Sequence, residues 1–168
     1  TDADLARPNI VVLYADDLGY GDVQCYNPDR GRIPTPNIDR LASHGIRFTD
    51  AYVCASYCAM SRAGLFTSRY PTRFGFERNP VGAKNLDPAV GLPESETTWI
   101  RQLRDGGYAT GLIGKWHLGK AGPLRPEAQG FNESLLMDNM LYLPEDHPDV
   151  VNAKLDYDPI DRFLWGVG

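Results

Sequence analysis

Two apolar runs have the pattern of strands that are buried inside a parallel sheet. Asn9–Ala15, with the sequence NIVVLYA, is continuously apolar and rich in β-branched residues. It lacks the alternation of apolar and polar positions that marks a strand with one exposed face, so both of its faces are expected to be covered. The run Ala109–Gly114 is likewise predicted to be a buried strand.

Start and stop signals predict a short helix after Thr35. Thr35 is a typical N-cap residue, Pro36 suits the first helical position, and Gly45 ends the helix. The apolar residues expected on its inner face are Ile38, Leu41 and Ala42. The helix therefore has both a defined length and an apolar face.

A further helix is predicted before the second apolar run. Ser95 or Thr97 is expected to cap it, and the glycine pair 106–107 is expected to end it. Strand, loop, helix and strand then follow one another, which favours an α/β fold with a mostly parallel central sheet flanked by helices.

The segment 70–96, rich in Pro and Gly, is predicted to be a surface excursion that lines a substrate cleft. Residues 135–143 are expected to form a short helix or strand, and the acidic run 146–161 a loop.

The composition is that of one globular domain, with 42% apolar and 23% charged residues. A net charge of −5 without a long basic run argues against nucleic-acid binding. No apolar run approaches the roughly 18 residues of a membrane helix. Three cysteines are too few for a disulfide framework, and the sequence leaves open whether Cys25 and Cys54 pair. The chain begins at Thr1 rather than Met, so we expect a processed or trimmed N-terminus and an exported protein.

The segment Cys54–Arg69, CASYCAMSRAGLFTSR, places a thiol, a hydroxyl and a guanidinium at the start of a predicted short helix. Unpaired backbone N–H groups and the helix dipole favour an anion at that end. Cys58 is therefore a candidate nucleophile, with Arg62 beside it. The alternative is that Cys58 is a small buried apolar residue and Arg62 a surface charge. A thiolate-phosphatase cradle needs an Arg six positions after the Cys, but position 64 is Gly.

Asp16 and Asp17 directly follow the first predicted strand. Open α/β sheets bind ligands at the carboxyl ends of their strands, and adjacent carboxylates repel each other unless a cation or a proton relieves them. Oxygen ligands favour Ca²⁺ or Mg²⁺ over Zn²⁺. The alternative is a solvated turn, which the glycines at 19 and 21 would suit.

The central segment resembles the signature of the type I sulfatases, Cys-x-Pro-Ser-Arg followed by Leu-x-Thr-Gly-Arg. The matching positions are Cys58, Ser61, Arg62, Leu65, Thr67 and Arg69. Met60 stands where the family usually has Pro, and Ser68 where it has Gly. The resemblance implies that the formylglycine-generating enzyme converts Cys58 to formylglycine, whose hydrated aldehyde attacks sulfur.

The segment after the first apolar run, and the run itself, also look like the N-terminal strand of the sulfatases. This resemblance implies that Asp16 and Asp17, together with residue 58, bind a metal ion, with Ca²⁺ favoured over Mg²⁺. Residues 35–52 resemble the family's link into a second strand, at 46–52. The segment 129–132, QGFN, is similar to the family's Gly-Phe-Asp turn, with Asn in place of Asp.

GKWHLG, residues 114–119, places Lys115 and His117 at the end of the predicted strand 109–114. Lys115 can present a positive charge to a sulfuryl oxygen, and His117 can exchange a proton near neutral pH. In sulfatases the matching Lys and His lie in the pocket. The resemblance therefore implies that Lys115 and His117 act in catalysis with Cys58 and Arg62.

The matched segments run from about Pro8 to Asn132, and nothing after Gly119 resembles the family's later metal ligands. We therefore expect residues 1–168 to be the N-terminal portion of a sulfatase catalytic domain. Its alkaline-phosphatase-like fold would be incomplete, and the isolated chain poorly active or inactive. The expected substrate is a sulfated small molecule or sulfated glycan, with the missing C-terminal portion as a partner. The alternatives are a phosphonate or phosphate monoester hydrolase of the same superfamily and a noncatalytic binding module.

Overall fold

A computed structural model of the protein describes residues 7–80, 84, 87–136, 143–144 and 163–164. The chain divides into two units, Thr1–Ala51 and Tyr52–Gly168, and each is described by itself. The predicted acidic loop 146–161 and most of the segment 135–143 lie outside the described residues. Within the described residues, no helix is long and apolar enough to cross a membrane.

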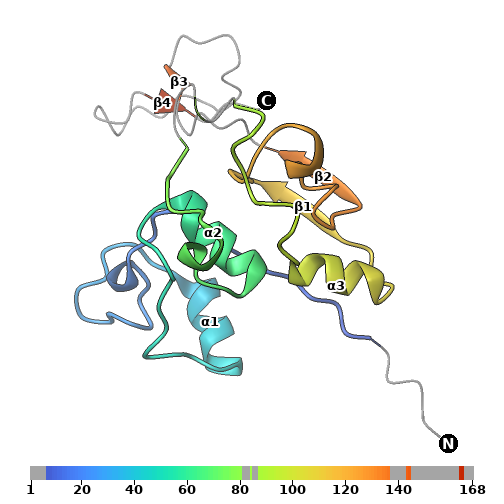
Figure 1. The fold of residues 1–168 in the computed structure, drawn as a ribbon. Coiled ribbons are helices and arrows are strands. Elements are labelled where there is room, and N and C mark those ends of the chain that lie inside the picture. Colours follow the sequence, from blue (N-terminus) through green and yellow to red (C-terminus); the bar gives the residue numbers. More distant parts are fainter. Residues whose placement is uncertain (1–6, 81–83, 85–86, 137–142, 145–162, 165–168) are drawn as a thin grey trace, which may run out of the picture. The chain divides into compact units, whose positions relative to one another are not determined.

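The first unit contains the predicted short helix. α1 spans Pro36–His44, and Gly45 follows it as expected (Figure 1). Thr35 precedes the helix, but its hydroxyl accepts a hydrogen bond from the backbone of Gln24 at 2.9 Å and donates one to Asp39 at 3.0 Å, so it does not cap the helix. A single 3-10 turn, η1, covers Tyr20–Asp22. The bounds of α1 are confirmed, whereas the expected inner face is exposed, with Leu41 at 64%.

The strands predicted at 9–15 and 46–52 are not formed in this structure, so both predictions are wrong. Neither segment has a ladder partner among the described residues. Their apolar side chains are exposed, with Leu13 at 82% and Ile46 at 82%. A strand depends on hydrogen bonds from a neighbour, because an isolated extended segment buries neither its backbone groups nor its side chains.

The second unit contains the remaining helices and strands of the described chain, drawn in Figure 1. They are α2 Cys58–Thr67, η2 Pro71–Phe74, α3 Trp99–Asp105, β1 Gly111–Gly114, η4 Gly122–Leu124, β2 Glu133–Leu136, β3 Leu143–Pro144 and β4 Phe163–Leu164. α2 begins where the sequence predicts. α3 ends at the predicted glycine, but its N-cap is Thr98, whose hydroxyl accepts from the backbone of Arg101 at 3.1 Å. Thr98 lies one position beyond the predicted Thr97.

The predicted parallel arrangement is confirmed for β1 and β2, which pair in parallel with Leu112 opposite Ser134 and Ile113 opposite Leu135. β3 and β4 form a separate antiparallel pair. β1 is not buried on both faces as predicted, because Ile113 is 84% exposed and its neighbour Leu135 63%. Within the described residues, one face of this two-stranded sheet is covered, since Leu112 and Leu136 pack against the core.

Aromatic side chains from three segments form the centre of the core in the second unit. The ring of Phe66 on α2 lies 5.2 Å from that of Trp116 and 5.9 Å from that of Phe131. Trp116 and Phe131 meet edge to face at 5.9 Å. The other buried members are Ala59, Ala63, Phe76, Leu92, Ile100 and Leu118. Each aromatic pair contributes about 0.5–1.5 kcal/mol beyond the burial of its area, so the residues after β1 are packed firmly against α2.

The segment 70–96, predicted to be a surface excursion, is irregular apart from η2 in its described part. It is not free of the core, however, because Phe76 and Leu92 are buried there. The backbone N–H of Leu92 also donates to the carbonyl of Leu118 at 2.8 Å. The excursion is therefore attached to the segment that follows β1.

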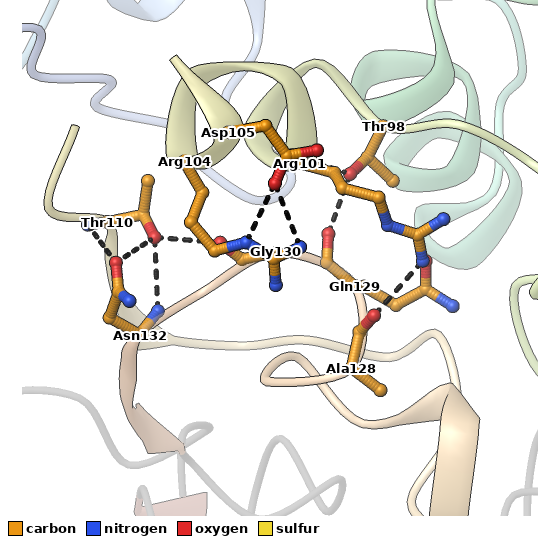
Figure 2. Close-up of polar contacts among 9 residues, drawn as sticks. All are labelled: Thr98, Arg101, Arg104, Asp105, Thr110, Ala128, Gln129, Gly130 and Asn132. Carbon is orange, nitrogen blue, oxygen red and sulfur yellow. Dashed lines mark hydrogen bonds and ion pairs between the residues drawn. The ribbon is translucent and has the colours of Figure 1, made fainter. Parts of the chain in front are cut away.

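The turn 129–132 is held between α3 and the two strands (Figure 2). The hydroxyl of Thr98 donates to the carbonyl of Gln129 at 2.6 Å. Gly130 has φ +120°, and a Cβ there would lie 2.6 Å from the backbone nitrogen of Arg101. Oδ1 of Asn132 accepts from the backbone N–H of Thr110 at 2.9 Å. A carboxylate oxygen could accept the same hydrogen bond. Asn132 can therefore replace the Asp found in the family that this sequence resembles.

Ser68, directly after α2, has φ +56° and ψ +28°, the left-handed conformation. We expect Ser68→Gly to raise the free energy of unfolding by about 0.5–1 kcal/mol, because Gly has no Cβ that disfavours positive φ. Ser68→Val should lower it, since a β-branched residue is disfavoured there. Urea unfolding followed by tryptophan fluorescence measures both. The prediction fails if the two variants shift the midpoint in the same direction.

Candidate active site

Cys58 is the first residue of α2 and is partly buried. The residue before it, Tyr57, makes no side-chain cap hydrogen bond. Instead, Oδ1 of Asn79 accepts from the backbone N–H of Ala59 at 3.2 Å and from the thiol of Cys58 at 3.8 Å. The first turn of α2 thus has a polar partner from a distant part of the chain, and the N–H of Ala59 is already engaged by it.

Arg62 is not a surface charge. Its side chain lies one turn along α2 and is 6% exposed. Its Nη1 donates to the carbonyl oxygen of Lys115 at 2.6 Å. A hydrogen bond from a charged donor is shorter and stronger than one between neutral groups. Arg62 therefore fixes the residue that follows β1 against α2.

Lys115 and His117 flank a core residue, Trp116. Trp116 is 3% exposed and donates through Nε1 to the carbonyl of Leu124 at 2.9 Å. Lys115 and His117 are also buried, at 8% and 6% exposure. His117 has φ +61°, a conformation that is uncommon outside glycine and clusters at functional sites.

The tautomer of His117 follows from one contact. Nε2 lies 2.8 Å from the carbonyl oxygen of Pro80. A carbonyl oxygen only accepts, so Nε2 carries the proton. In the neutral ring Nδ1 is then the atom with a lone pair, and it is the position at which His117 can take up a proton.

Contacts within the second unit link the predicted residues in two pairs. Arg62 joins α2 to Lys115, while Asn79 and Pro80 join the first turn of α2 to His117. Sequence reasoning missed Asn79 and Pro80. Their only signal was an Asn-Pro dipeptide, which marks a turn but no chemistry.

Cys54 is a structural residue of the same unit. Its Sγ lies 3.8 Å from the carbonyl of Met60, and a Cβ at Gly64 would lie 2.1 Å from that sulfur. Gly64 is therefore required for the close approach of Cys54 to α2. Both Cys25 and Cys54 are free thiols, so the structure does not pair them.

Asp16 and Asp17 belong to the first unit. Asp16 is partly buried, and Asp17 is exposed with φ +59°. Carboxylate oxygens suit a hard divalent ion, so the two residues fit Ca²⁺ or Mg²⁺ by the type of their donor atoms. In the part of the chain that the structure describes, no group of three or more His, Cys, Asp or Glu side chains is placed to hold a metal ion.

These features define an α/β protein in which a helix that begins at a cysteine is linked to the segment after β1 by a buried arginine and by the contacts of residues 79–80. A family model described as Sulfatase matches residues 8–161. The chain belongs to this family, which confirms the resemblance of its sequence to the sulfatases.

Arylsulfatase H of Homo sapiens is 53% identical over an alignment of 121 residues, which covers 68% of this chain and 20% of that protein. Arylsulfatase A of Homo sapiens is 47% identical over 130 residues, 76% of this chain and 25% of that protein. The chain therefore spans about a fifth to a quarter of the length of these curated relatives.

Two solved structures support the fold. The crystal structure of Ps i-CgsB is 39% identical with a TM-score of 0.66, and the match covers 73% of this chain and 26% of that one. The structure of BT4656 in complex with its substrate D-glucosamine-2-N,6-O-disulfate is 31% identical with a TM-score of 0.61, covering 80% and 24%. The predicted fold class, a sulfatase-like α/β fold present only in part, is confirmed.

We expect Arg62→Ala to lower the free energy of unfolding by about 2 kcal/mol or more, because it removes the buried, charged donor to the carbonyl oxygen of Lys115. Arg125→Ala is the matched control, since Arg125 is 59% exposed and lies 3.5 Å from Glu127. Its loss should cost no more than about 0.5 kcal/mol. Equal urea midpoints for the two variants would contradict the structural role of Arg62.

Proposed function

We propose that this chain is the N-terminal part of the catalytic domain of a sulfuric ester hydrolase. Membership in the Sulfatase family supports the reaction class. The observation that carries the proposal is the set of contacts that links Cys58 to His117 through residues 79–80, and Arg62 to Lys115. These contacts support the proposal because they link groups suited to binding and cleaving an anionic ester.

The side chain at position 58 supplies the nucleophile. We propose that the formylglycine-generating enzyme converts Cys58 to formylglycine before or during folding. When hydrated, this group offers one hydroxyl that attacks sulfur and displaces the alcohol, which leaves with that hydroxyl's proton. Deprotonation of the second hydroxyl then breaks the bond from carbon to the sulfate oxygen, which releases sulfate and restores the aldehyde. The start of α2 suits it, because backbone N–H groups and the helix dipole favour negative charge there.

Lys115 and Arg62 provide positive charge in a buried setting. Charge that develops on the sulfuryl oxygens is stabilised most strongly by groups that are already in place. Lys115 is 8% exposed, and its backbone is held by the bond from Arg62. In this proposal Lys115 faces the sulfate group, while Arg62 contributes charge and keeps Lys115 in position.

His117 is the proton acceptor of the proposed reaction. Because its Nε2–H is bound to the carbonyl of Pro80, Nδ1 takes the proton from the second hydroxyl at residue 58. A ring that is fixed by one hydrogen bond needs little reorganisation to act. The same proton can later leave to solvent.

Asp16 and Asp17, with residue 58, would hold a divalent metal, Ca²⁺ in the first place and Mg²⁺ in the second. When bound, such an ion polarises a sulfate oxygen and stabilises an ionised hydroxyl. Ca²⁺ takes about six to eight oxygen ligands, so the remaining ligands would come from a part of the protein outside this chain.

The proposed substrate is a sulfate ester of a carbohydrate or of a small alcohol. A second solved structure of Ps i-CgsB, 38% identical to this chain with a TM-score of 0.66, is a complex with k-i-k-neocarrahexaose. BT4656 was solved with a sulfated glucosamine. Both relatives bind a carbohydrate and the second binds a sulfated one, which supports a sulfated glycan as the substrate. Export of the protein stays a prediction.

The test is turnover of an aryl sulfate and of a sulfated sugar by the complete protein, produced in a host that makes formylglycine. The peptide that carries position 58 should be about 18 Da lighter than its unmodified form. Cys58→Ala should lower kcat/KM by about 10³-fold or more, because it removes the nucleophile.

Cys54→Ala is the matched thiol control. It should leave the loss of about 18 Da at position 58 unchanged and the turnover within about tenfold of that of the parent. An unmodified thiol at position 58 would count against the proposal. Faster cleavage of a phosphonate ester than of any sulfate ester would assign the protein to the alternative reaction of its superfamily. Absence of turnover by the complete, modified protein would favour a binding function.

A further inference from the structure

One side-chain oxygen touches the first two residues of α2 from a distant segment. Oδ1 of Asn79 accepts from the thiol of Cys58 at 3.8 Å and from the backbone N–H of Ala59 at 3.2 Å. The next residue, Pro80, is buried, and its carbonyl binds Nε2 of His117 at 2.8 Å. We call residues 79–80 the strap.

The contact with Ala59 has the chemistry of a helix cap. The first N–H groups of a helix have no partner inside the helix, and Asn is among the best residues to bind one. A cap normally comes from the residue next to the helix, but Tyr57 makes no such bond. Here the cap is 20 residues away in the chain. It therefore caps the start of α2 and also attaches the strap to that helix.

The contact with Cys58 restricts the direction of that side chain. A thiol is a weak donor, whereas a hydroxyl at the same position is a strong one. Oδ1 of Asn79 is a pure acceptor, so it can bind one O–H of a hydrated aldehyde without removing its proton. The other hydroxyl is then the one left to attack sulfur.

The two halves of the strap are adjacent residues, and Pro80 has a fixed φ angle. A change in the place of Asn79 is therefore transmitted over one peptide bond to the carbonyl that holds His117. We propose that Asn79 is a positioning residue, which orients the side chain at position 58 relative to His117. This proposal rests on the proposed function, since it assigns Asn79 a part in that reaction.

The first experiment compares Asn79→Ala and Asn79→Asp in the complete, formylglycine-containing protein. Asn79→Ala should lower kcat about tenfold and leave KM within about twofold, because it removes orientation and not substrate contacts. Asn79→Asp keeps the acceptor oxygens, so kcat should stay within about threefold of the parent, while its charge should raise KM for an anionic substrate.

The controls distinguish an effect of Asn79 on the orientation of residue 58 from an effect on folding or on the conversion of Cys58 to formylglycine. Arg78→Ala changes the exposed neighbour of Asn79 and should behave as the parent. The mass of the position-58 peptide should be the same in all variants, since residue 79 lies outside the signature segment. Equal losses of kcat in Asn79→Ala and Asn79→Asp would overturn the proposal, because only one of them lacks the acceptor.

The second experiment does not depend on sulfatase activity. In the complete protein from a host without the modifying enzyme, position 58 remains a thiol. The rate of its alkylation by iodoacetamide, followed by peptide mass spectrometry, should rise about fivefold in Asn79→Ala, because the S–H group loses its acceptor and the N–H of Ala59 becomes available to a thiolate. The alkylation rate should fall in Asn79→Asp, because a carboxylate beside the thiol disfavours the thiolate.

The two experiments distinguish failure of the proposed function from failure of the proposed role of Asn79. If the parent protein does not hydrolyse sulfate esters but the alkylation rates change as expected, the proposed function is wrong and the positioning of residue 58 by Asn79 stands. If Asn79→Ala and Arg78→Ala both alkylate at the rate of the parent, the role of Asn79 is refuted whatever the activity. Circular dichroism of each variant shows that it is folded.

Discussion

The buried hydrogen bond from Arg62 to the carbonyl of Lys115 is the constraint on which the site depends. It joins the middle of α2 to the end of β1 over a distance of 2.6 Å. Burying a guanidinium is costly unless it is bound, and leaving the carbonyl without a donor is costly too. The bond therefore fixes α2 and the segment after β1 to each other, and the backbone of Lys115 is held in one position.

The aromatic core also stabilises this arrangement. Trp116 packs against Phe66 of α2, and its two neighbours along the chain are Lys115 and His117. Burying the indole fixes the backbone between Lys115 and His117, and the bond from His117 to Pro80 fixes the second of these side chains.

The helices and β1 could be predicted from the sequence because their signals are local. Pro36 and Gly45 bound α1, and Gly106 bounds α3. The strands predicted at 9–15 and 46–52 failed for the opposite reason. Apolar and β-branched residues show that a segment is suited to a sheet, but the sheet exists only where a neighbour supplies hydrogen bonds.

Local chemistry in the sequence was enough to identify Cys58, Arg62, Lys115 and His117 as candidates and to indicate the family, because a short motif carries its residue types at fixed spacing. Only the tertiary structure decided that Arg62 is a buried link and that the segment at 79–80 reaches both α2 and His117. Those contacts join residues 20 to 53 positions apart. They arise from packing of the folded chain, which no local pattern encodes.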